Sequence, residues 1–421
     1  MKTVMELLRA DSRVSDWKIN ENHKESYELF FVKGKLETVR CTDTCDKQVT
    51  VYADHGEYKG DSQFFIYPST TQEQIRELIG EAVEKARLLN NKAYSLPGGE
   101  TGSFQVESNF EEYAPADLAM AVAQAVFAAN TMEGADLNSV EIFINKHTEQ
   151  VRNSRGLDKT QVRYSAMVEA IPTYNGETQS VELYEQYNFN ALDEAAITRR
   201  IAETLEEVKA RYEAKAPEQP LECDVVLNRQ ELGQLFMNIA SNLHYATVYS
   251  HSNLWSKGNM VQKDRTGDPI SITMCGEIPG SVRSTKFDDD GMSLGSICVV
   301  EEGMAANYYG SNRYGQYLNE TPTGDLRCIR VAPGTAAESE GRYLEVVSMS
   351  GLQVDFFNDY IGGEIRLAYY FDGEKKCPVT GISISGSANQ VLSTIALSQN
   401  MCVNGGYAGP EKAVLKGMKI F

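Results

Sequence analysis

Three consecutive carboxylates form the densest group of potential ligands in this sequence. Asp288, Asp289 and Asp290 precede Gly291, and an Asp-Gly pair between short β-prone runs is typical of a tight turn. Hard cations such as Ca²⁺ and Mg²⁺ prefer several carboxylate oxygens, so the triplet could hold one of them. The spacing of an EF-hand loop is missing. We therefore interpret the triplet as a solvated turn, with a metal site as the alternative.

Histidine and cysteine offer the other candidate ligands, and their spacing argues against one shared metal. His244 and His251 are seven residues apart, which in an unbroken helix places them on one face but about 10 Å apart along the axis. That separation is too long for one metal held directly by both. We interpret both as helix-surface or hydrogen-bonded histidines. Cys402 is interpreted as a half-buried structural thiol, and Cys41 and Cys45 as ordinary thiols, because no second pair follows them.

A tyrosine-rich segment suggests a different kind of site. Tyr308, Tyr309, Arg313, Tyr314 and Tyr317 lie on a glycine-containing stretch. Tyrosines on such a segment can hold a peptide through apolar contact and hydroxyl hydrogen bonds. An exposed loop or edge strand is the alternative interpretation.

Two other common signatures are absent from the sequence. It contains no phosphate-binding loop and no dinucleotide fingerprint. The 421 residues include 40 basic and 59 acidic side chains, and the net charge of −19 repels phosphate backbones. We therefore expect no direct nucleic-acid binding.

The same composition bears on localisation. No apolar run approaches the about 20 residues of a membrane span, and the N-terminus lacks the apolar core of a signal peptide. The eight cysteines are scattered without a paired framework. We expect a reduced, cytoplasmic protein that does not bind membranes.

The first half of the chain has the pattern of an α+β domain covering residues 1–215. Strands are expected over residues 27–39, 48–53 and near 64–67, followed by a helix from Thr70 or Thr71 with a capping box. A second, alanine-rich helix follows Pro115. Strands at 140–144, 161–170 and 180–187 then precede a helix capped by Asn190. Strands followed by a helix thus occur twice, which suggests an internal duplication.

The second half, residues 221–421, has a different composition. Two prolines in Ala216–Pro220 mark a linker. A strand at 221–227 and a helix at 231–249 follow, and short strands separated by Gly, Asp and Asn turns fill most of 270–421, with a short helix at 388–398. This pattern predicts a β-rich antiparallel, barrel-like domain, and therefore a two-domain protein.

Several motifs of the second half resemble the TldD/PmbA family. They are, in order, Asp224–Leu227, Phe287–Gly291 with the following Glu302–Gly303 turn, Gly363–Arg366 with Cys377–Gly386, and the ending Gly409–Met418. Their order and spacing carry the resemblance over nearly the whole chain.

The resemblance implies where catalysis should occur and why this chain lacks it. In the TldD branch, the helix after the Val-Val-Leu strand carries His-Glu-x-x-x-His, whose histidines bind zinc while the Glu activates water. By count from Leu227, Met237, Asn238 and Asn242 stand at the ligand, base and ligand positions. An asparagine provides no imidazole and is no general base near neutral pH.

The resemblance therefore implies a PmbA (TldE)-like chain without its own zinc. Such a chain would be the non-catalytic subunit of a metallopeptidase complex that degrades or matures unfolded peptides, with zinc in a TldD-like partner of a heterodimer. A homodimer of this chain is the alternative to the heterodimer. Two further alternatives remain: a metallopeptidase with a shifted site built from His244, His251 or Cys402, and a peptidase-independent binding protein of the type called modulator of DNA gyrase.

Overall fold

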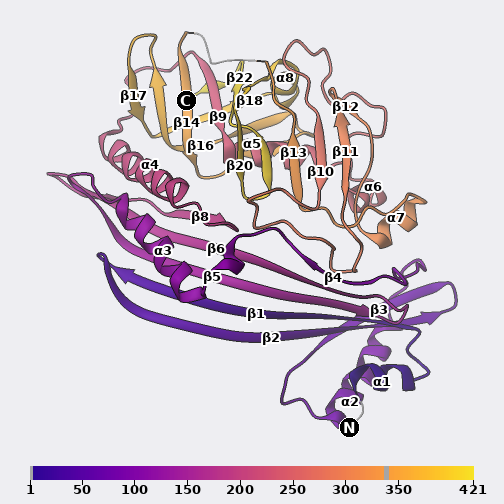
Figure 1. Cartoon of the computed structure of the whole chain (residues 1–421). Coiled ribbons are helices and arrows are strands. Elements are labelled where there is room, and N and C mark those ends of the chain that lie inside the picture. The colour runs from indigo at the N-terminus through magenta and orange to yellow at the C-terminus, as the bar shows by residue number, and fades with distance from the viewer. Residues whose placement is uncertain (1–2, 336–340) are drawn as a thin grey trace.

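The computed structural model describes residues 3–335 and 341–421 and has two layered halves that meet face to face (Figure 1). The first half contains α1 (Val4–Ala10), β1 (Asp16–Val32), β2 (Lys35–His55), β3 (Tyr58–Ile66), α2 (Gln72–Ala86), β4 (Thr101–Gln105), the 3₁₀ turn η1 (Phe110–Glu112), α3 (Pro115–Ala128), β5 (Ala135–Asn153), β6 (Asp158–Asn175), β7 (Ser180–Glu182), β8 (Glu185–Phe189) and α4 (Glu194–Glu213).

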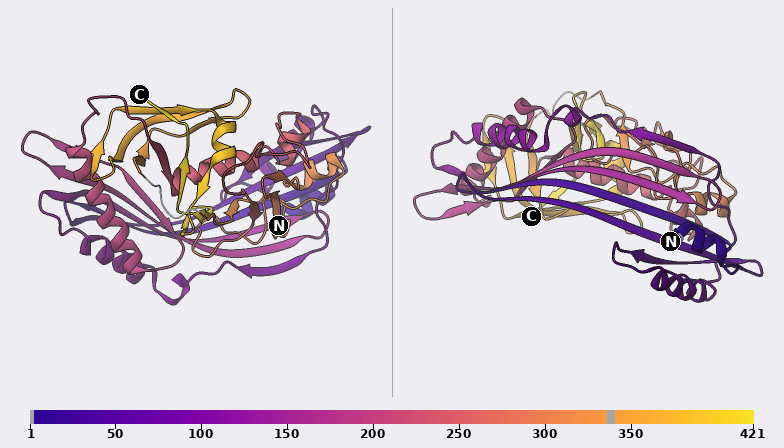
Figure 2. Two further views of the ribbon diagram at one scale, coloured as in Figure 1. Left: turned by 90° about the horizontal axis from the view of Figure 1, so that it is seen from above. Right: turned by 60° about the horizontal axis from the view of Figure 1, so that its bottom comes forward.

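One sheet organises this half. Its strand order is β3-β2-β1-β5-β6-β4, and β7 and β8 pair along β6. The hairpins β1-β2 and β5-β6 are long, and β1 pairs antiparallel with β5 from Lys18↔Asn153 to Val32↔Ser139. Figure 2 shows these long strands curving beneath the second half. The predicted order of strands followed by a helix occurs twice, ending in α2 and in α4.

The two faces of β1 show why the sheet has a helix side and a polar side. Successive residues of a strand point to opposite faces. Trp17, Ile19 and Leu29 are buried in the clusters that the helices cover. Lys18 and Asn20 alternate with them and contact the second half of the chain.

The predicted strand over residues 27–39 was wrong in its boundaries. The chain reverses at Lys33 and Gly34, whose φ values are 48° and 72°. A hairpin turn with positive φ at both central residues matches the twist of the flanking strands. The turn was not predicted because β-prone residues continue on both sides of it and resemble one strand. The predicted N-cap of α4 was also wrong. Asp193, and not Asn190, caps this helix.

The second half contains β9 (Asp224–Asn228), α5 (Arg229–Ser241), α6 (Tyr245–Tyr249), β10 (Ile272–Cys275), β11 (Ser296–Glu301), β12 (Met304–Ala305), α7 (Asn312–Leu318), β13 (Cys328–Val331), β14 (Tyr343–Met349), β15 (Gln353–Asp355), β16 (Tyr360–Phe371), β17 (Lys376–Val379), β18 (Ile382–Gly386), α8 (Ala388–Thr394), β19 (Ala396–Leu397), β20 (Met401–Asn404), β21 (Tyr407–Pro410), β22 (Lys412–Leu415) and β23 (Lys419–Ile420).

These strands form two sheets around one core, where a single barrel-like antiparallel sheet was predicted. The first has the order β12-β11-β10-β13-β21-β20, and the second has the order β19-β22-β9-β14-β16-β18-β23, with β15 and β17 pairing on β16. Each sheet includes a parallel pair, β13 with β21 and β9 with β14. Helix α5 packs between the sheets, because its Leu232, Leu235 and Phe236 are fully buried in their shared core. The α+β class is confirmed, and the single closed sheet is not.

Candidate functional site

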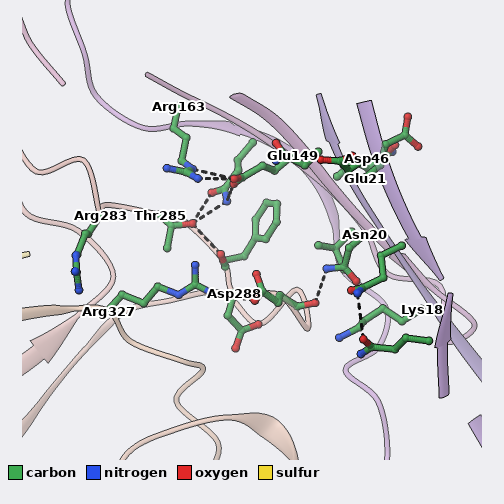
Figure 3. Close-up of a pocket in the computed structure, with 18 of the residues that line it drawn as sticks. Lys18, Asn20, Glu21, Asp46, Glu149, Arg163, Arg283, Thr285, Asp288 and Arg327 are labelled. Carbon is green, nitrogen blue, oxygen red and sulfur yellow. Dashed lines mark hydrogen bonds and ion pairs between the residues drawn. The ribbon is translucent and has the colours of Figure 1, made fainter. Parts of the chain in front are cut away.

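A cleft of about 880 Å³ lies where the polar face of the first sheet meets the second half (Figure 3). Strands β1, β2, β3, β5 and β6 supply one wall. The opposite wall consists of Met237 from α5 and residues of the segments 283–289 and 326–327. The cleft therefore combines residues that are far apart in the sequence.

Buried polar contacts fix the 285–293 segment against the sheet. The Nζ of Lys159, a residue that is only 1% exposed, donates to Gly291 O at 2.9 Å and to Ser293 Oγ at 2.7 Å. The Gln161 amide exchanges hydrogen bonds with Thr285 Oγ1 and accepts from Lys286 N at 2.8 Å. Because buried polar groups are costly without partners, these bonds favour one position of the segment.

The acidic triplet lies in this segment and is only partly the solvated turn that the sequence predicted, because the Asp289 side chain is 80% exposed whereas Asp288 is buried. Asp288 is 3% exposed, and its carboxylate accepts hydrogen bonds from the backbone N–H groups of Asp290, Met292 and Asp325 at 2.9 Å each. Burial, together with the nearby charge of Asp290, raises the pKa of Asp288 to about 6.

The other two carboxylates of the triplet also have protein partners. Asp289 pairs with Arg327 at 2.9 Å, and Asp290 pairs with Lys18 on the sheet. Within residues 3–335 and 341–421, no group of three or more His, Cys, Asp or Glu side chains is arranged to hold a metal ion. The triplet therefore joins the two halves of the molecule.

Helix α5 carries Met237 and Asn238, and Asn242 is its C-cap. The family resemblance led us to expect these three residues at the positions of the zinc motif. Met237 lines the cleft. The Asn238 and Asn242 side-chain amides donate to the carbonyls of Gln234 and Asn238, at 2.9 and 3.0 Å. The side-chain oxygen of Asn242 also accepts from Leu254 N at 3.0 Å. These side chains stabilise the helix and the following loop, and their donor set does not fit zinc.

The predicted helix over 231–249 is broken at His244, which caps α6. Its Nδ1 accepts from Ala246 N at 3.2 Å, its Nε2 lies 3.2 Å from Asp325 Oδ1, and its ring packs edge-on against Tyr309. His251 is exposed, with a left-handed φ of 55°. The two histidines thus lie on different local structures and share no helical face.

Cys402 lies on β20, half-buried beside the core. Burial raises the pKa of its thiol to about 11, so the thiol is protonated at neutral pH. Since metal binding and nucleophilic attack both need the thiolate, neither is favoured here.

The tyrosine-rich segment forms helix α7 and its approach, in place of the exposed loop or edge strand that the sequence suggested. Tyr309 is 3% exposed in the core, and Tyr317 is 6% exposed and donates its hydroxyl to Lys92 O at 2.6 Å. Arg313 donates to the Tyr317 hydroxyl at 3.0 Å.

Tyr308 and Tyr314 are the more exposed members of the same set. The Tyr308 hydroxyl accepts from Lys257 N at 3.2 Å, and Tyr314 packs against Tyr249. None of these aromatic or arginine side chains lines the cleft. Contact between this segment and a peptide stays a prediction. Only the more exposed rings could contact a peptide without unfolding of the segment.

Sequence reasoning singled out Met237, Asp288 and Asp289 but missed the residues on the sheet wall of the cleft. Their signal was weak but present: polar residues alternate along β1 at Lys18, Asn20 and Asn22, opposite an apolar face. Arg163 lies on β6, where its guanidinium pairs with Glu149 at 2.6 Å. Only the pairing of β1 with β5 and of β5 with β6 brings these side chains onto one face.

Comparison with known proteins gives one sequence match and several structural matches. Residues 220–420 match the family model described as PmbA/TldA metallopeptidase C-terminal domain. No curated protein sequence matches the chain.

The structural matches extend over nearly the whole chain. TldE from Thermococcus kodakarensis aligns with a TM-score of 0.80 at 15% identity, over 99% of this chain and 100% of that one. Two proteins described as proposed modulators of DNA gyrase also align. The Thermotoga maritima protein does so with a TM-score of 0.74 at 16% identity, covering 96% of each chain. The Bacteroides thetaiotaomicron protein does so with 0.77 at 13% identity, covering 99% of this chain and 97% of that one. At these identities the likeness shows the fold.

The helices were also compared with the requirements for crossing a bilayer. Among those in the described part of the chain, none is both long and apolar enough to do so.

Proposed function

The chain belongs to the TldD/PmbA family through its C-terminal half, and from this premise we propose that it is a non-catalytic, PmbA (TldE)-like subunit of a zinc metallopeptidase complex. The observation that carries the proposal is the chemistry of α5. Met237, Asn238 and Asn242 stand where the catalytic branch has two zinc ligands and a general base.

The chemistry of these side chains supports the absence of a catalytic zinc in this chain. Zinc that activates water needs imidazole, thiolate or carboxylate ligands, and a base must accept a proton near neutral pH. The amides of Asn238 and Asn242 already bond to the helix backbone, and Met237 offers only a weak thioether acceptor. Hydrolysis would therefore occur at the zinc of a TldD-like partner.

In this proposal the complex is a cytoplasmic heterodimer that cleaves or matures unfolded peptides. The match of the whole chain to the TldE fold supports the assignment to the non-catalytic branch. No observation favours a shifted site in this chain, because His244, His251 and Cys402 each occupy a different local environment. A homodimer, or a peptidase-independent role of the gyrase-modulator type, would appear as a different outcome of the same experiment.

The test is co-expression of this chain, carrying a tag, with a His-Glu-x-x-x-His homologue from the same genome. We expect the two chains to purify together with about one zinc per complex, and the isolated tagged chain to hold none after zinc loading and desalting. Replacing the first His of the partner's motif should remove zinc and hydrolysis of an unfolded protein. Asn238→Ala in this chain should change neither the zinc content of the complex nor its hydrolysis of the unfolded protein.

Two results would overturn the proposal. One is zinc in the isolated chain that is lost in His244→Ala or Cys402→Ala. The other is the absence of any complex, with this chain recovered alone or only as a homodimer.

A further inference from the structure

Side-chain amides dominate the sheet wall of the cleft. They belong to Asn20, Asn22, Gln48, Gln63, Gln150 and Gln161. Several of their polar atoms have no partner within the described residues. Asn22 forms no side-chain hydrogen bond there, and its Oδ1 is buried, as is the unpartnered Oδ1 of Asn20. Gln48 donates to Gln63 Oε1 at 3.1 Å, which leaves the acceptor of Gln48 and the donors of Gln63 unused. Because buried polar atoms normally have partners, the Oδ1 atoms of Asn20 and Asn22 indicate a ligand. The free atoms of Gln48 and of the exposed Gln63 are not buried and are available to the same ligand.

The chemistry of an amide side chain matches that of a peptide backbone. Each amide carries one acceptor and two donors, so it can bond to a backbone N–H and a backbone C=O without regard to sequence or charge. Asn20 and Asn22 are two residues apart on β1, and such residues repeat every about 7 Å along a strand. An extended peptide repeats its own backbone groups at the same distance.

The opposite wall of the cleft carries two arginines, two aspartates and apolar surface. Figure 3 shows Arg283 and Arg327 on the side away from the strand that carries Asn20. Arg327 pairs with Asp289, whereas the guanidinium of Arg283 has no acceptor or acidic partner among the residues that the structure describes. Met237 and Leu326 supply apolar contact beside them.

Arg283 is nevertheless held in place. Its backbone N donates to Ser281 Oγ at 3.1 Å. Its aliphatic stem crosses Gly406, where an added Cβ would meet Arg283 Cδ at 2.7 Å. The residue is exposed and its stem rests on Gly406, so its unpaired guanidinium is open to a ligand. The planar fork of donors suits a carboxylate.

We propose that the cleft binds the C-terminal end of a short, extended peptide, with the amides of Asn22, Gln48 and Gln63 on its backbone and Arg283 on its terminal carboxylate. The proposal rests on the proposed function only in taking the ligand to be a peptide. The cavity of about 880 Å³ lies in the size range of small-ligand sites. It therefore fits a few residues and not a long unfolded chain.

The test uses the isolated chain and a synthetic tetrapeptide of alanine and leucine, as the free acid and as the C-terminal amide, by titration calorimetry. We expect the free acid to bind at least tenfold more tightly than the amide. Arg283→Gln should remove this difference, and Arg283→Lys should retain part of it. The double variant Asn22→Ala, Gln48→Ala should weaken the binding of both peptides by the same factor, because these substitutions affect only the contacts to the peptide backbone.

Matched control variants lie outside the cleft. Arg366→Gln on β16 removes an exposed guanidinium, and Gln186→Ala on β8 removes an exposed amide. Both should bind the two peptides as the unmodified chain does. Thermal melting of every variant confirms that the fold is intact.

Three outcomes would overturn the proposal: no binding of either peptide, equal affinity for the acid and the amide, or unchanged affinity in the Asn22→Ala, Gln48→Ala variant. Because the chain is tested alone, these outcomes are independent of complex formation. A chain that binds the peptide but recruits no zinc subunit would refute the proposed function and leave the cleft assignment intact.

Discussion

Asp288 shows how burial of one side chain makes the stability of the fold sensitive to pH. Its carboxylate is 3% exposed and has a pKa of about 6 against an ordinary value of 3.8. The folded state therefore binds more protons than the unfolded state between about pH 4 and pH 6. It follows that the contribution of Asp288 to stability is greatest below this window and is lost as the pH rises through it.

We predict that Asp288→Asn removes this pH dependence. As the pH rises from 4 to 7, the unmodified chain should lose about 3 kcal/mol of its free energy of unfolding relative to the variant. Asparagine stays neutral, although it cannot accept from Asp325 N with its NH₂ group. Urea unfolding at each pH measures the difference.

Asp289→Asn is the matched control, because Asp289 is next to Asp288 in sequence but its side chain is 80% exposed. A stability difference for Asp288→Asn that is constant across this pH range would refute the assignment of a raised pKa to Asp288.

The acidic triplet also shows what the sequence could indicate at the scale of a residue. The Asp-Gly turn was predictable, because local sequence determines such turns. The burial of Asp288 was not, because it depends on Asp325, 37 positions along the chain, and on the sheet beneath. The same limit applies to the cleft, where only long-range packing brings Asn22 and Arg283 into the lining of one cavity.

At the scale of elements, the break between α5 and α6 was the most informative departure from the sequence pattern. Apolar periodicity continues across residues 231–249, so one helix was expected. Instead, α5 ends at Ser241 and the His244 side chain caps a new helix. The imidazole thus stabilises the start of the second helix, and this signal is weak in the sequence because histidine is not among the preferred capping residues.

We predict that His244→Ala destabilises the protein without altering its metal content. Loss of the cap should cost about 1 to 2 kcal/mol, since Ala246 N loses its acceptor and Tyr309 loses a packing partner. Urea unfolding provides the measurement.

His251→Ala is the control for this prediction. The residue is exposed, and the change should remain within about 0.5 kcal/mol. Equal effects of the two substitutions would contradict a specific capping role for His244.

Short, locally determined elements were predicted more reliably than strand pairing. The helix α8 at Ala388–Thr394 and the capping box of α2 at Thr71 were confirmed. The division of the second half into two sheets was not predicted, because parallel pairs such as β9 with β14 join strands more than a hundred residues apart. Local sequence carries little information on such pairings.

At the scale of the whole molecule, the halves are connected both covalently and through the cleft region. Residues 216–220 are largely exposed, with a polar and proline-containing sequence, and we propose them as the domain boundary. The second connection consists of buried polar bonds, among which those of Lys159 are the most enclosed. Cutting the linker should therefore leave the two halves associated.

We predict that limited proteolysis first cuts after Lys215 with trypsin and after Glu218 with a glutamyl endopeptidase, because residues 215–220 are largely exposed. The two fragments should still elute together in gel filtration. Lys159→Met should make them separate at a lower urea concentration, because loss of the buried ammonium leaves Gly291 O and Ser293 Oγ without their donor, at a cost of about 3 kcal/mol.

Lys146→Met is the matched control, since that lysine forms only a half-exposed ion pair with Glu25 on the same sheet. It should leave the separation of the fragments unchanged. Primary cleavage within 140–190 or 282–320 would show that the boundary lies elsewhere. Fragments that separate without urea would show that the buried bonds of the 285–293 segment do not hold the halves together, and that the linker alone positions the walls of the cleft.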